Sequence, residues 1–534
     1  MAPTRTMGGE NDSERDPVSR RLSRRFQVIL VGEGALVGIA AGAIVTLYRL
    51  ALSHAEGLLR LVTGKAAGSV LPMLGWFLLL FLMMLAVSAL LRWEPATSGS
   101  GIPQVDAEVL GRLDAPWARV IPAKFVEGTL LALSGLSLGR EGPSVQLGGM
   151  SGKAVSRVLG RRRGEERLLV TCGAAAGMSA AFHAPLTGVL FALEEIHKEF
   201  SAPLIISVMS SAVAADFLVS QVLGLEPVVS LVFLANLPHA DYLFVVALGV
   251  LCGLLGALHN RGMFAVQALY ARLPAPLSNH RLIIPFVVAG LVAFTWPELM
   301  CGGDAIVETL QARAFPSVTS LLVLLLGKYL FTAVCFGSGA PGGTLFPLVV
   351  LGGLVGGAFS VVAMRLGLPP LYCPNFVALG VAGLFSGVVR APVTAVVLVF
   401  ELTGSLDALL SVTLVSVLAY VVSSLTRADA FYEHLLAALL EASDGDPLGG
   451  HVGETELGTV RVGAGSRLEG ARICEVPWPD GVRVLTIERA GERLVPTGDT
   501  VLLAADELLF MAREGGVDDA RLKLSVMGEQ HLRP

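Results

Sequence analysis

Three glycine-rich motifs interrupt apolar stretches of this sequence and could bind an anion through their backbone. They read SGSGIP at residues 98–103, GREGP at 139–143 and GSGAPGG at 337–343. A glycine-rich break that opens a helix leaves N–H groups unpaired at the positive end of the helix dipole. Such groups attract an anion without a full positive charge, so the binding is reversible. One motif alone is equally typical of a tight packing turn, but three in one apolar chain favour an anion site.

The second motif also contains a carboxylate that needs an explanation. Glu141 stands between Arg140 and Gly142, within apolar surroundings. A carboxylate near the centre of a bilayer costs roughly 2.5–3.5 kcal/mol on insertion scales. At a helix N-terminus it could occupy the place of an anion and leave when protonated, which would make it both a gate and a proton carrier. An ion pair with Arg140 is the structural alternative.

The apolar region consists of two halves that resemble each other. GREGP corresponds to GSGAP, and APLT at residues 184–187 corresponds to APVT at 391–394. Glu194 and Glu401 follow these two tetrapeptides at the same separation. Two related halves with interrupted helices are typical of a transporter whose site lies at the repeat interface, near the membrane midplane.

The elements that must position these motifs are membrane helices. Of the 534 residues, 53% are hydrophobic and 16% charged, whereas soluble domains average about 25% charged residues. About ten or more segments are nearly free of charge and about long enough to cross a bilayer, some of them short and broken by Gly or Pro. We therefore predict an all-α polytopic membrane protein over residues 27–441, with halves at about 27–225 and 238–441.

The N-terminal segment, residues 1–26, is polar and ends in a cluster of arginines directly before the first apolar run. Basic residues next to a membrane segment favour the cytoplasmic side. We therefore predict a cytoplasmic N-terminus, with the arginine-rich loop at 161–163 on the same side. The six cysteines show no metal-binding or redox spacing, and we predict no metal site.

The three motifs, in this order and spacing, resemble those of the CLC chloride channel and transporter family over roughly residues 27–441. The resemblance implies a homodimer in which each subunit has its own ion path, built from inverted repeats of tilted, partly broken helices. It implies an anion-binding set of Ser100, Gly101, Ile102, Arg140, Glu141, Gly142, Thr344, Leu345, Phe346 and Tyr432.

Within this set the resemblance assigns roles. The hydroxyls of Ser100 and Tyr432 would bind the central chloride, and the backbone amides of Thr344 and Leu345 would complete the site. Glu141 matches the external gating glutamate. In this family serine at the position of Ser100 accompanies chloride preference and proline accompanies nitrate. The order GTLFP at 343–347 departs from many members, in which Phe stands closer to the glycine pair.

A second carboxylate distinguishes an exchanger from a channel in this family, because exchangers have an internal glutamate that passes protons. Glu194 and Glu195 are adjacent, and neighbours on a helix point about 100° apart, so they cannot share a role. Glu194 is the counterpart of Glu401 and is predicted to be structural, through capping or pairing within the dimer. Glu195, whose repeat counterpart is Leu402, matches the proton glutamate. Its structural alternative is a position that merely faces the cytoplasmic vestibule.

We therefore predict a secondary active exchanger of chloride for protons, with an uncoupled chloride channel of the same family as the alternative. A fluoride-type exchanger is less consistent with GSGIP. An intramembrane hydrolase built on Ser137 and His183 lacks the usual sequence around its serine, and His183 is interpreted as a local hydrogen-bonding residue. We expect no enzyme activity, cofactor or nucleic-acid partner, and a bacterial plasma membrane with both termini cytoplasmic.

The chain changes character after residue 441. A polar linker at 442–450 leads to a segment at 451–534 with the alternation of strands. Residues 482–489 and 492–496 predict a hairpin, and 497–503 and 506–511 two further strands. This small α/β segment resembles the C-terminal domain of RCK/TrkA-type regulatory subunits. The resemblance implies either a dimer clamp or a sensor that binds a nucleotide or another ligand.

Overall fold

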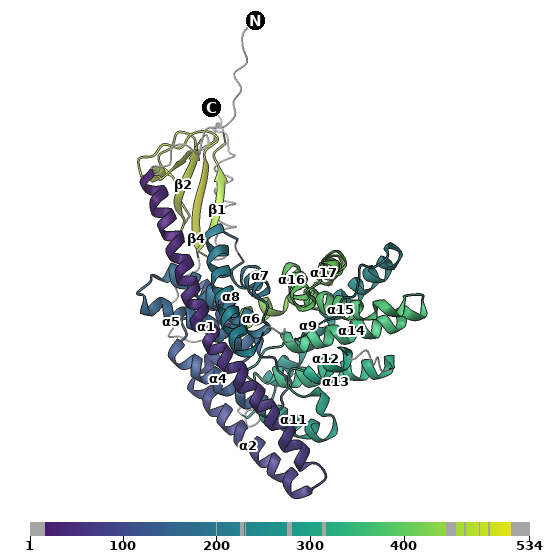
Figure 1. Ribbon diagram of the computed structural model, residues 1–534. Coiled ribbons are helices and arrows are strands. Elements are labelled where there is room, and N and C mark those ends of the chain that lie inside the picture. Colours follow the sequence, from purple (N-terminus) through teal and green to yellow (C-terminus); the bar gives the residue numbers. More distant parts are fainter. Residues whose placement is uncertain are drawn as a thin grey trace. The chain divides into compact units, whose positions relative to one another are not determined.

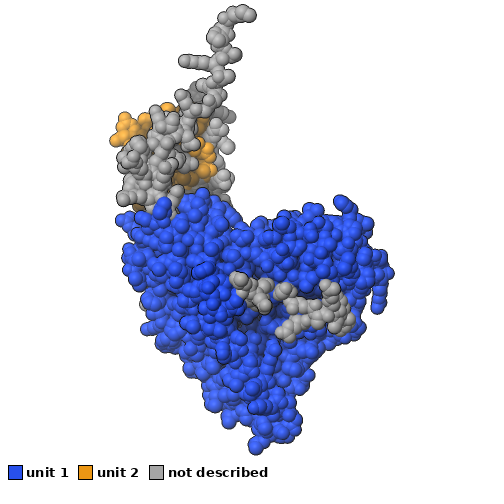
Figure 2. Space-filling model, in the orientation of Figure 1, with its two compact units in different colours: residues 1–442 blue, residues 443–534 orange. Residues whose placement is uncertain are grey.

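The computed structural model describes residues 17–198, 200–224, 229, 231–274, 280–311, 317–444, 455–463, 466–479, 481–489 and 492–513. The chain divides into two compact units, residues 1–442 and residues 443–534 (Figure 2). The first unit is helical. In a bilayer each backbone polar group must find a partner within the protein, and a helix provides one within its own segment.

The helices of the two halves form two adjoining groups in the first unit (Figure 1). Those of the first half are α1 (Pro17–Ala66), α2 (Val70–Trp93), α3 (Ile102–Leu110), α4 (Trp117–Leu133), α5 (Glu141–Val158), α6 (Arg163–Phe182), α7 (Pro185–Phe191) and α8 (Ala202–Leu223). Those of the second half are α9 (Tyr242–Ala271), α11 (Ile283–Thr295), α12 (Asp304–Gln311), α13 (Val318–Gly337), α14 (Leu345–Arg365), α15 (Cys373–Val389), α16 (Pro392–Thr403), α17 (Leu409–Leu425) and α18 (Phe431–Asp444).

Within the described residues, eight helices are long and apolar enough to cross a membrane, and α11 and α16 are shorter apolar helices. Together they match the predicted set of apolar segments, some of them short. The described segments differ in burial: α14 and α15 are almost wholly inside the protein, whereas α2 exposes most of its apolar surface. The exposed apolar surface of α2 suits contact with lipid. The buried helices α14 and α15 belong to the core of the unit.

Small residues bring the core helices together in the same way in both halves. A Cβ atom on Gly148 of α5 would lie 2.1 Å from the carbonyl oxygen of Gly173 in α6. In the second half, a Cβ on Gly380 of α15 would lie 2.3 Å from the carbonyl oxygen of Gly352 in α14. Membrane helices pack closely through such residues. The shared packing supports the internal repeat that the sequence predicts.

The second unit contains an antiparallel four-stranded sheet of order β1-β4-β2-β3, with β1 (Thr455–Arg461), β2 (Arg483–Arg489), β3 (Glu492–Leu494) and β4 (Glu507–Arg513). The predicted hairpin is confirmed as β2 and β3, and the strand predicted at 506–511 as β4. The strand predicted at 497–503 is wrong. There Thr497 and Thr500 bond each other in a turn, and Val501 forms only an isolated bridge to Arg472. The hydrogen bonds of these threonine hydroxyls favour a turn over the strand that the alternation of apolar residues predicted.

Candidate functional site

The three glycine-rich motifs meet at one place. Gly139 and Gly343 exchange both backbone hydrogen bonds, at N–O distances of 2.6 and 2.8 Å. The N–H of Gly99 donates to the carbonyl of Gly339 (3.2 Å), and the N–H of Gly342 donates to that of Gly99 (3.0 Å). The motifs open α3, α5 and α14, so the N-termini of three helices converge. Their dipoles favour negative charge at this point.

Glycines allow the close approach between α3 and α5. Gly101 caps α3 in the left-handed region, at φ +96°. A Cβ on Gly142 would lie 2.4 Å from the carbonyl oxygen of Ser100 and 2.5 Å from its hydroxyl. A side chain at Gly142 would therefore fill the space beside Ser100. Ile102, the first residue of α3, is itself buried.

Two buried hydroxyls face this place without a partner. Ser100 is 3% exposed and Tyr432 is 1% exposed, and neither hydroxyl has a hydrogen-bond partner. The hydroxyl of Tyr432 lies near the side chains of Ser100 and Thr344 but has hydrogen-bond geometry to neither. A buried hydroxyl left unsatisfied costs about 1–3 kcal/mol. Two donors that converge beside helix N-termini can be satisfied together by one anion.

Aromatic contacts fix the orientation of Tyr432. Its ring packs edge-on against Phe191 and Phe431, with centroid distances of 6.2 and 5.3 Å. Tyr432 lies in the first turn of α18, far along the chain from the motifs. The structure thus brings Tyr432, Ser100 and Thr344 together, as the resemblance implies. Leu345 opens α14, directly beyond Thr344.

Glu141 is the first residue of α5 and is fully buried. Its Oε2 accepts a hydrogen bond from the N–H of Phe346 at 3.2 Å, and its Oε1 has no partner. Arg140 turns to other groups. Its guanidinium lies 4.0 Å from the carboxylate of Asp304 and 5.2 Å from the ring centroid of Phe346. The carboxylate of Glu141 therefore accepts the backbone N–H of Phe346, in the first turn of α14 in the second half.

Glu194 and Glu195 point to different partners. Glu194 accepts hydrogen bonds from the N–H and the hydroxyl of Thr394, both at 2.7 Å, which confirms the predicted capping role. Glu195 is buried, and its Oε1 has no partner. Asp106 and Lys198 lie close enough to interact with it electrostatically. The two glutamates belong to a π-helical turn, Ala192–His197, a local geometry that often occurs at functional sites.

Two buried lysines hold the loops of the site in place, a role that the sequence did not predict. The ammonium of Lys124 donates to the carbonyls of Thr97 (2.7 Å) and Gly99 (2.8 Å). In the second half, Lys328 donates to the carbonyls of Leu299 (3.0 Å) and Cys301 (2.8 Å). A lysine in an apolar segment was the available signal, because such a group is buried only with partners.

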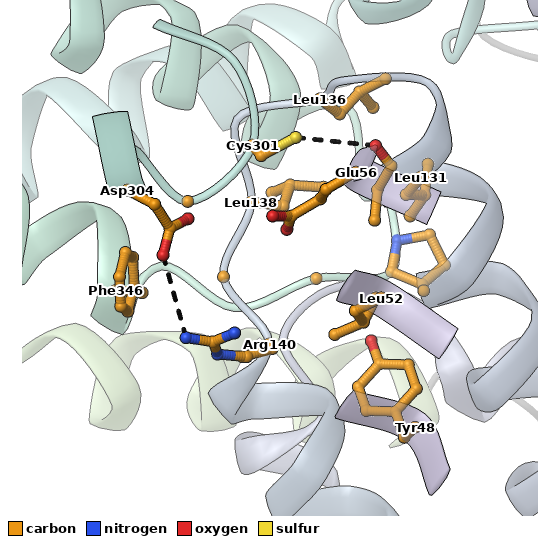
Figure 3. Close-up of a pocket in the computed structure, with 16 residues that line it drawn as sticks. Tyr48, Leu52, Glu56, Leu131, Leu136, Leu138, Arg140, Cys301, Asp304 and Phe346 are labelled. Atoms are coloured by element: carbon orange, nitrogen blue, oxygen red, sulfur yellow. Dashed lines mark hydrogen bonds and ion pairs between the residues drawn. The ribbon is translucent and has the colours of Figure 1, made fainter. Parts of the chain in front are cut away.

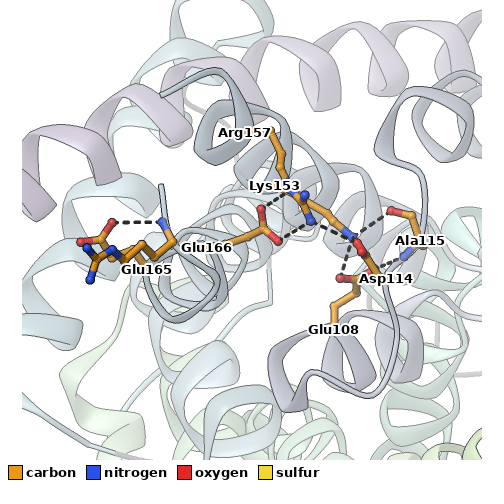
Figure 4. A network of polar contacts seen from close by, with 8 residues as sticks. Glu108, Asp114, Ala115, Lys153, Arg157, Glu165 and Glu166 are labelled. Carbon is orange, nitrogen blue, oxygen red and sulfur yellow. Dashed lines mark hydrogen bonds and ion pairs between the residues drawn. The ribbon is translucent and has the colours of Figure 1, made fainter. Parts of the chain in front are cut away.

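A polar network between α3 and α5 has a structural role (Figure 4). The ammonium of Lys153 lies 2.8 Å from a carboxylate oxygen of Glu108 and 2.6 Å from one of Asp114. Arg157 pairs with Glu166. Lys153 is twelve residues beyond Glu141, or about 18 Å along the helix. Each charge has its partner, so the network ties helices together rather than binding an ion.

The structure does not bring the candidate hydrolase residues together. The hydroxyl of Ser137 bonds that of Thr332 at 2.7 Å, and Nδ1 of His183 lies 2.9 Å from a carboxylate oxygen of Asp216. The local role predicted for His183 agrees with this contact. In the described part of the chain, no cluster of three His, Cys, Asp or Glu side chains could hold a metal ion.

Comparison with known families gives two matches. Residues 82–424 match the family described as voltage gated chloride channel. Residues 457–525 match the TrkA-C domain.

Individual proteins are similar over most of the chain. A Vibrio cholerae protein named H(+)/Cl(-) exchange transporter ClcA is 33% identical over 448 residues, which cover 80% of this chain and 93% of the relative. A Vibrio parahaemolyticus protein of the same name is 32% identical, with 80% and 93% covered. The crystal structure of a slow cyanobacterial Cl⁻/H⁺ antiporter matches with a TM-score of 0.73 and 28% identity, over 78% of this chain and 99% of that one. A CLC-type fluoride/proton antiporter shares the fold, with a TM-score of 0.62 at 24% identity, over 76% and 97%.

Proposed function

Because this chain belongs to the CLC family and ends in a TrkA-C domain, we propose that it is a secondary active exchanger that moves chloride against protons. It is an integral membrane protein. The relatives named as exchangers, and the solved antiporter that it resembles, support exchange over an uncoupled channel.

Chloride would bind where the three motifs meet. The N-termini of α3, α5 and α14 supply positive potential. The hydroxyls of Ser100 and Tyr432 supply two donors that have no other partner. The backbone around Thr344 and Leu345 completes the enclosure, as the resemblance implies. No full cation is needed, so chloride can leave again.

Glu141 and Glu195 would carry the proton. When Glu141 is ionised, its carboxylate accepts the N–H of Phe346 and competes with an anion for the end of α14. Protonation removes that charge and frees the amide. Glu195, the second buried carboxylate near Tyr432, would exchange protons with the cytoplasm. The observation that carries the proposal is this second buried carboxylate with an unpartnered oxygen, because a passive anion pore has no use for it.

The proposal also covers the orientation of the chain in the membrane and its assembly into a dimer. We place both termini in the cytoplasm, in a bacterial plasma membrane. The pair between Arg161 and Glu33 supports this, because it joins the loop at 161–163 to the arginine-rich end of α1. The resemblance adds a homodimer with one path in each subunit. The two roles predicted for the TrkA-C domain, a dimer clamp and a ligand sensor, stay predictions.

A coupled flux assay tests the function. The purified protein is placed in liposomes with a chloride gradient, and the pH inside and outside is followed. We expect chloride running downhill to move protons uphill, and a proton gradient to move chloride uphill. Chloride flux without any proton movement would support the channel instead, and no chloride flux would contradict both.

A further inference from the structure

A cavity of about 30 Å³, enough for about two water molecules, lies beside the gating glutamate, between α1, α4 and the loops that precede α5, α12 and α14 (Figure 3). Gly139, Arg140 and Phe346 form part of its wall. Two of these contact Glu141: a Cβ on Gly139 would lie 2.2 Å from its Oε2, and the N–H of Phe346 donates to the same atom. The cavity therefore adjoins the carboxylate whose Oε1 has no partner.

The charges on this cavity are unexpected for an anion entrance. Among the described residues that line it, Arg140 is the one cation, and Glu56 and Asp304 are the carboxylates. Asp304 lies 4.0 Å from the guanidinium. Glu56 interacts electrostatically with both, and its carboxylate points toward them (Figure 3). One positive and two negative groups leave a net charge of −1 when all three are ionised, which repels chloride.

The net charge of the cavity depends on Arg140, Glu56 and Asp304, because the other charged groups nearby do not line it. Arg60 and Lys328 also interact with Glu56, but neither lines the cavity. Arg60 and Glu298, of opposite charge, line an adjoining cavity beside Glu56 and Asp304, and the ammonium of Lys328 is bound to two carbonyls. Tyr48 and Cys301 line it as neutral groups. Protons bound by Glu56 or Asp304 are thus the way to change the sign of the cavity charge.

We propose that Glu56 and Asp304 form a proton-controlled entrance for chloride, separate from the gate at Glu141. Each proton that the two carboxylates take up makes the cavity one unit more positive, until the guanidinium of Arg140 is left uncompensated and draws in an anion. The inference rests on the exchange proposed above. It places the cavity on the external side, because Glu56 lies ten residues before Ala66, at the end of α1 opposite to the arginine cluster at residues 20–25, which is placed in the cytoplasm.

The physical consequence is that chloride and protons would be taken up from the external side under the same conditions. An acidic external solution would load chloride into the cavity under the conditions in which Glu141 also receives its proton. A neutral external solution would keep chloride away. Glu56 and Asp304 would set how much external chloride is needed, while Glu141 and Glu195 would set the coupling.

Currents through a planar bilayer test this directly. Chloride and protons carry opposite charges in opposite directions, so exchange produces a current at any stoichiometry, and each side can be changed alone. The variant is Glu56→Gln, which removes one charge and keeps the pair of Arg140 with Asp304. The matched control is Asp407→Asn, an exposed carboxylate that accepts a hydrogen bond from Asn236 and lines neither this cavity nor the adjoining one.

At about pH 7.5 on the external side, we expect Glu56→Gln to reach half-maximal current at about fivefold lower external chloride than the unaltered protein, the effect of one short-range charge in water. Near about pH 4, where Asp and Glu ordinarily take up protons, the two proteins should converge. Asp407→Asn should follow the unaltered protein, and Asp304→Asn should shift in the same direction as Glu56→Gln.

Equal chloride dependence of Glu56→Gln and the unaltered protein at both pH values would overturn the inference. A shift that persists unchanged near about pH 4 would also overturn it, because it would report packing rather than charge. In both cases the unaltered protein would still exchange chloride for protons. Loss of the proposed function would instead appear as an absence of proton-coupled current in the unaltered protein.

Discussion

Glu194 and Glu401 each cap a helix in the opposite half of the membrane unit. Glu194 binds the N–H and the hydroxyl of Thr394 in the first turn of α16, both at 2.7 Å. Glu401 binds the N–H and the hydroxyl of Thr187 in the first turn of α7, at 2.7 and 2.6 Å. Each half therefore caps a helix of the other half, through carboxylates at equivalent positions of the repeat.

Replacing either glutamate with alanine should therefore lower stability. Loss of such a cap costs about 1–2 kcal/mol of stability. Both substitutions should therefore lower the thermal unfolding midpoint of the purified protein, and the two decreases should be similar to each other. Glu441→Ala, which changes an exposed side chain of α18, is the control and should leave the midpoint unchanged. If Glu194→Ala and Glu401→Ala behaved like this control, the capping role would be wrong.

Glu141→Gln should keep chloride moving and abolish proton coupling. Glutamine has the shape of a protonated glutamate, so the amide of Phe346 stays available to an anion while no proton can be released. The measurement is chloride and proton flux in the same liposomes. Uphill proton movement in this variant would show that Glu141 does not carry the proton.

Glu195→Gln should stop proton movement while chloride still leaks, because the internal carboxylate is lost and the chloride site is intact. The same paired flux measurement applies. Glu441→Gln, at an exposed position, is the control and should remain coupled. Coupling retained in Glu195→Gln would contradict the assignment of Glu195.

Ser100→Ala and Tyr432→Phe should each weaken chloride binding by about tenfold or more, since a hydrogen bond to a charged group contributes about 1.5–3 kcal/mol. Calorimetric titration with chloride measures this. Ser137→Ala is the control, because that hydroxyl bonds Thr332 instead. The resemblance adds that Ser100→Pro should shift preference toward nitrate. Unchanged chloride affinity in both hydroxyl variants would place the anion elsewhere.

Asp506 should make the C-terminal unit sensitive to acid. Burial alone would raise the pKa of Asp506, but the bidentate guanidinium of Arg489 (2.9 and 2.7 Å) and the N–H of Leu503 (2.8 Å) hold it below its usual value. A lowered folded-state pKa stabilises the fold at neutral pH, and this stabilisation is lost as the pH falls below about 4.

Hydrogen exchange of the β4 amides in the whole protein measures that loss. We expect protection to decrease as the pH falls through this range, after correction for intrinsic exchange rates. Asp506→Asn should be less protected at neutral pH and should respond less to acid. An acid response of Asp506→Asn equal to that of the unaltered protein would assign the effect to another group.

Much of the membrane unit could be predicted because its signals are local. Apolar length predicts spanning helices, and glycine breaks predict helix starts such as that at Glu141. The equal separation before Glu194 and Glu401 predicted their equivalence. Which carbonyls Lys124 binds, and that Glu56 and Asp304 face one cavity, depend on segments far apart in the chain, so no local pattern contains them. The assignments of Ser100 and Tyr432 to chloride stay predictions.

The paired backbone bonds between Gly139 and Gly343 constrain how alternating access is achieved. Many transporters with internal repeats expose their substrate by rocking one half against the other around a central site. Here the halves are fastened to each other at that site, and a rigid-body swing would have to break both bonds. We therefore expect switching between the two sides to use movements smaller than a domain, such as rotation of a carboxylate or displacement of an outer helix.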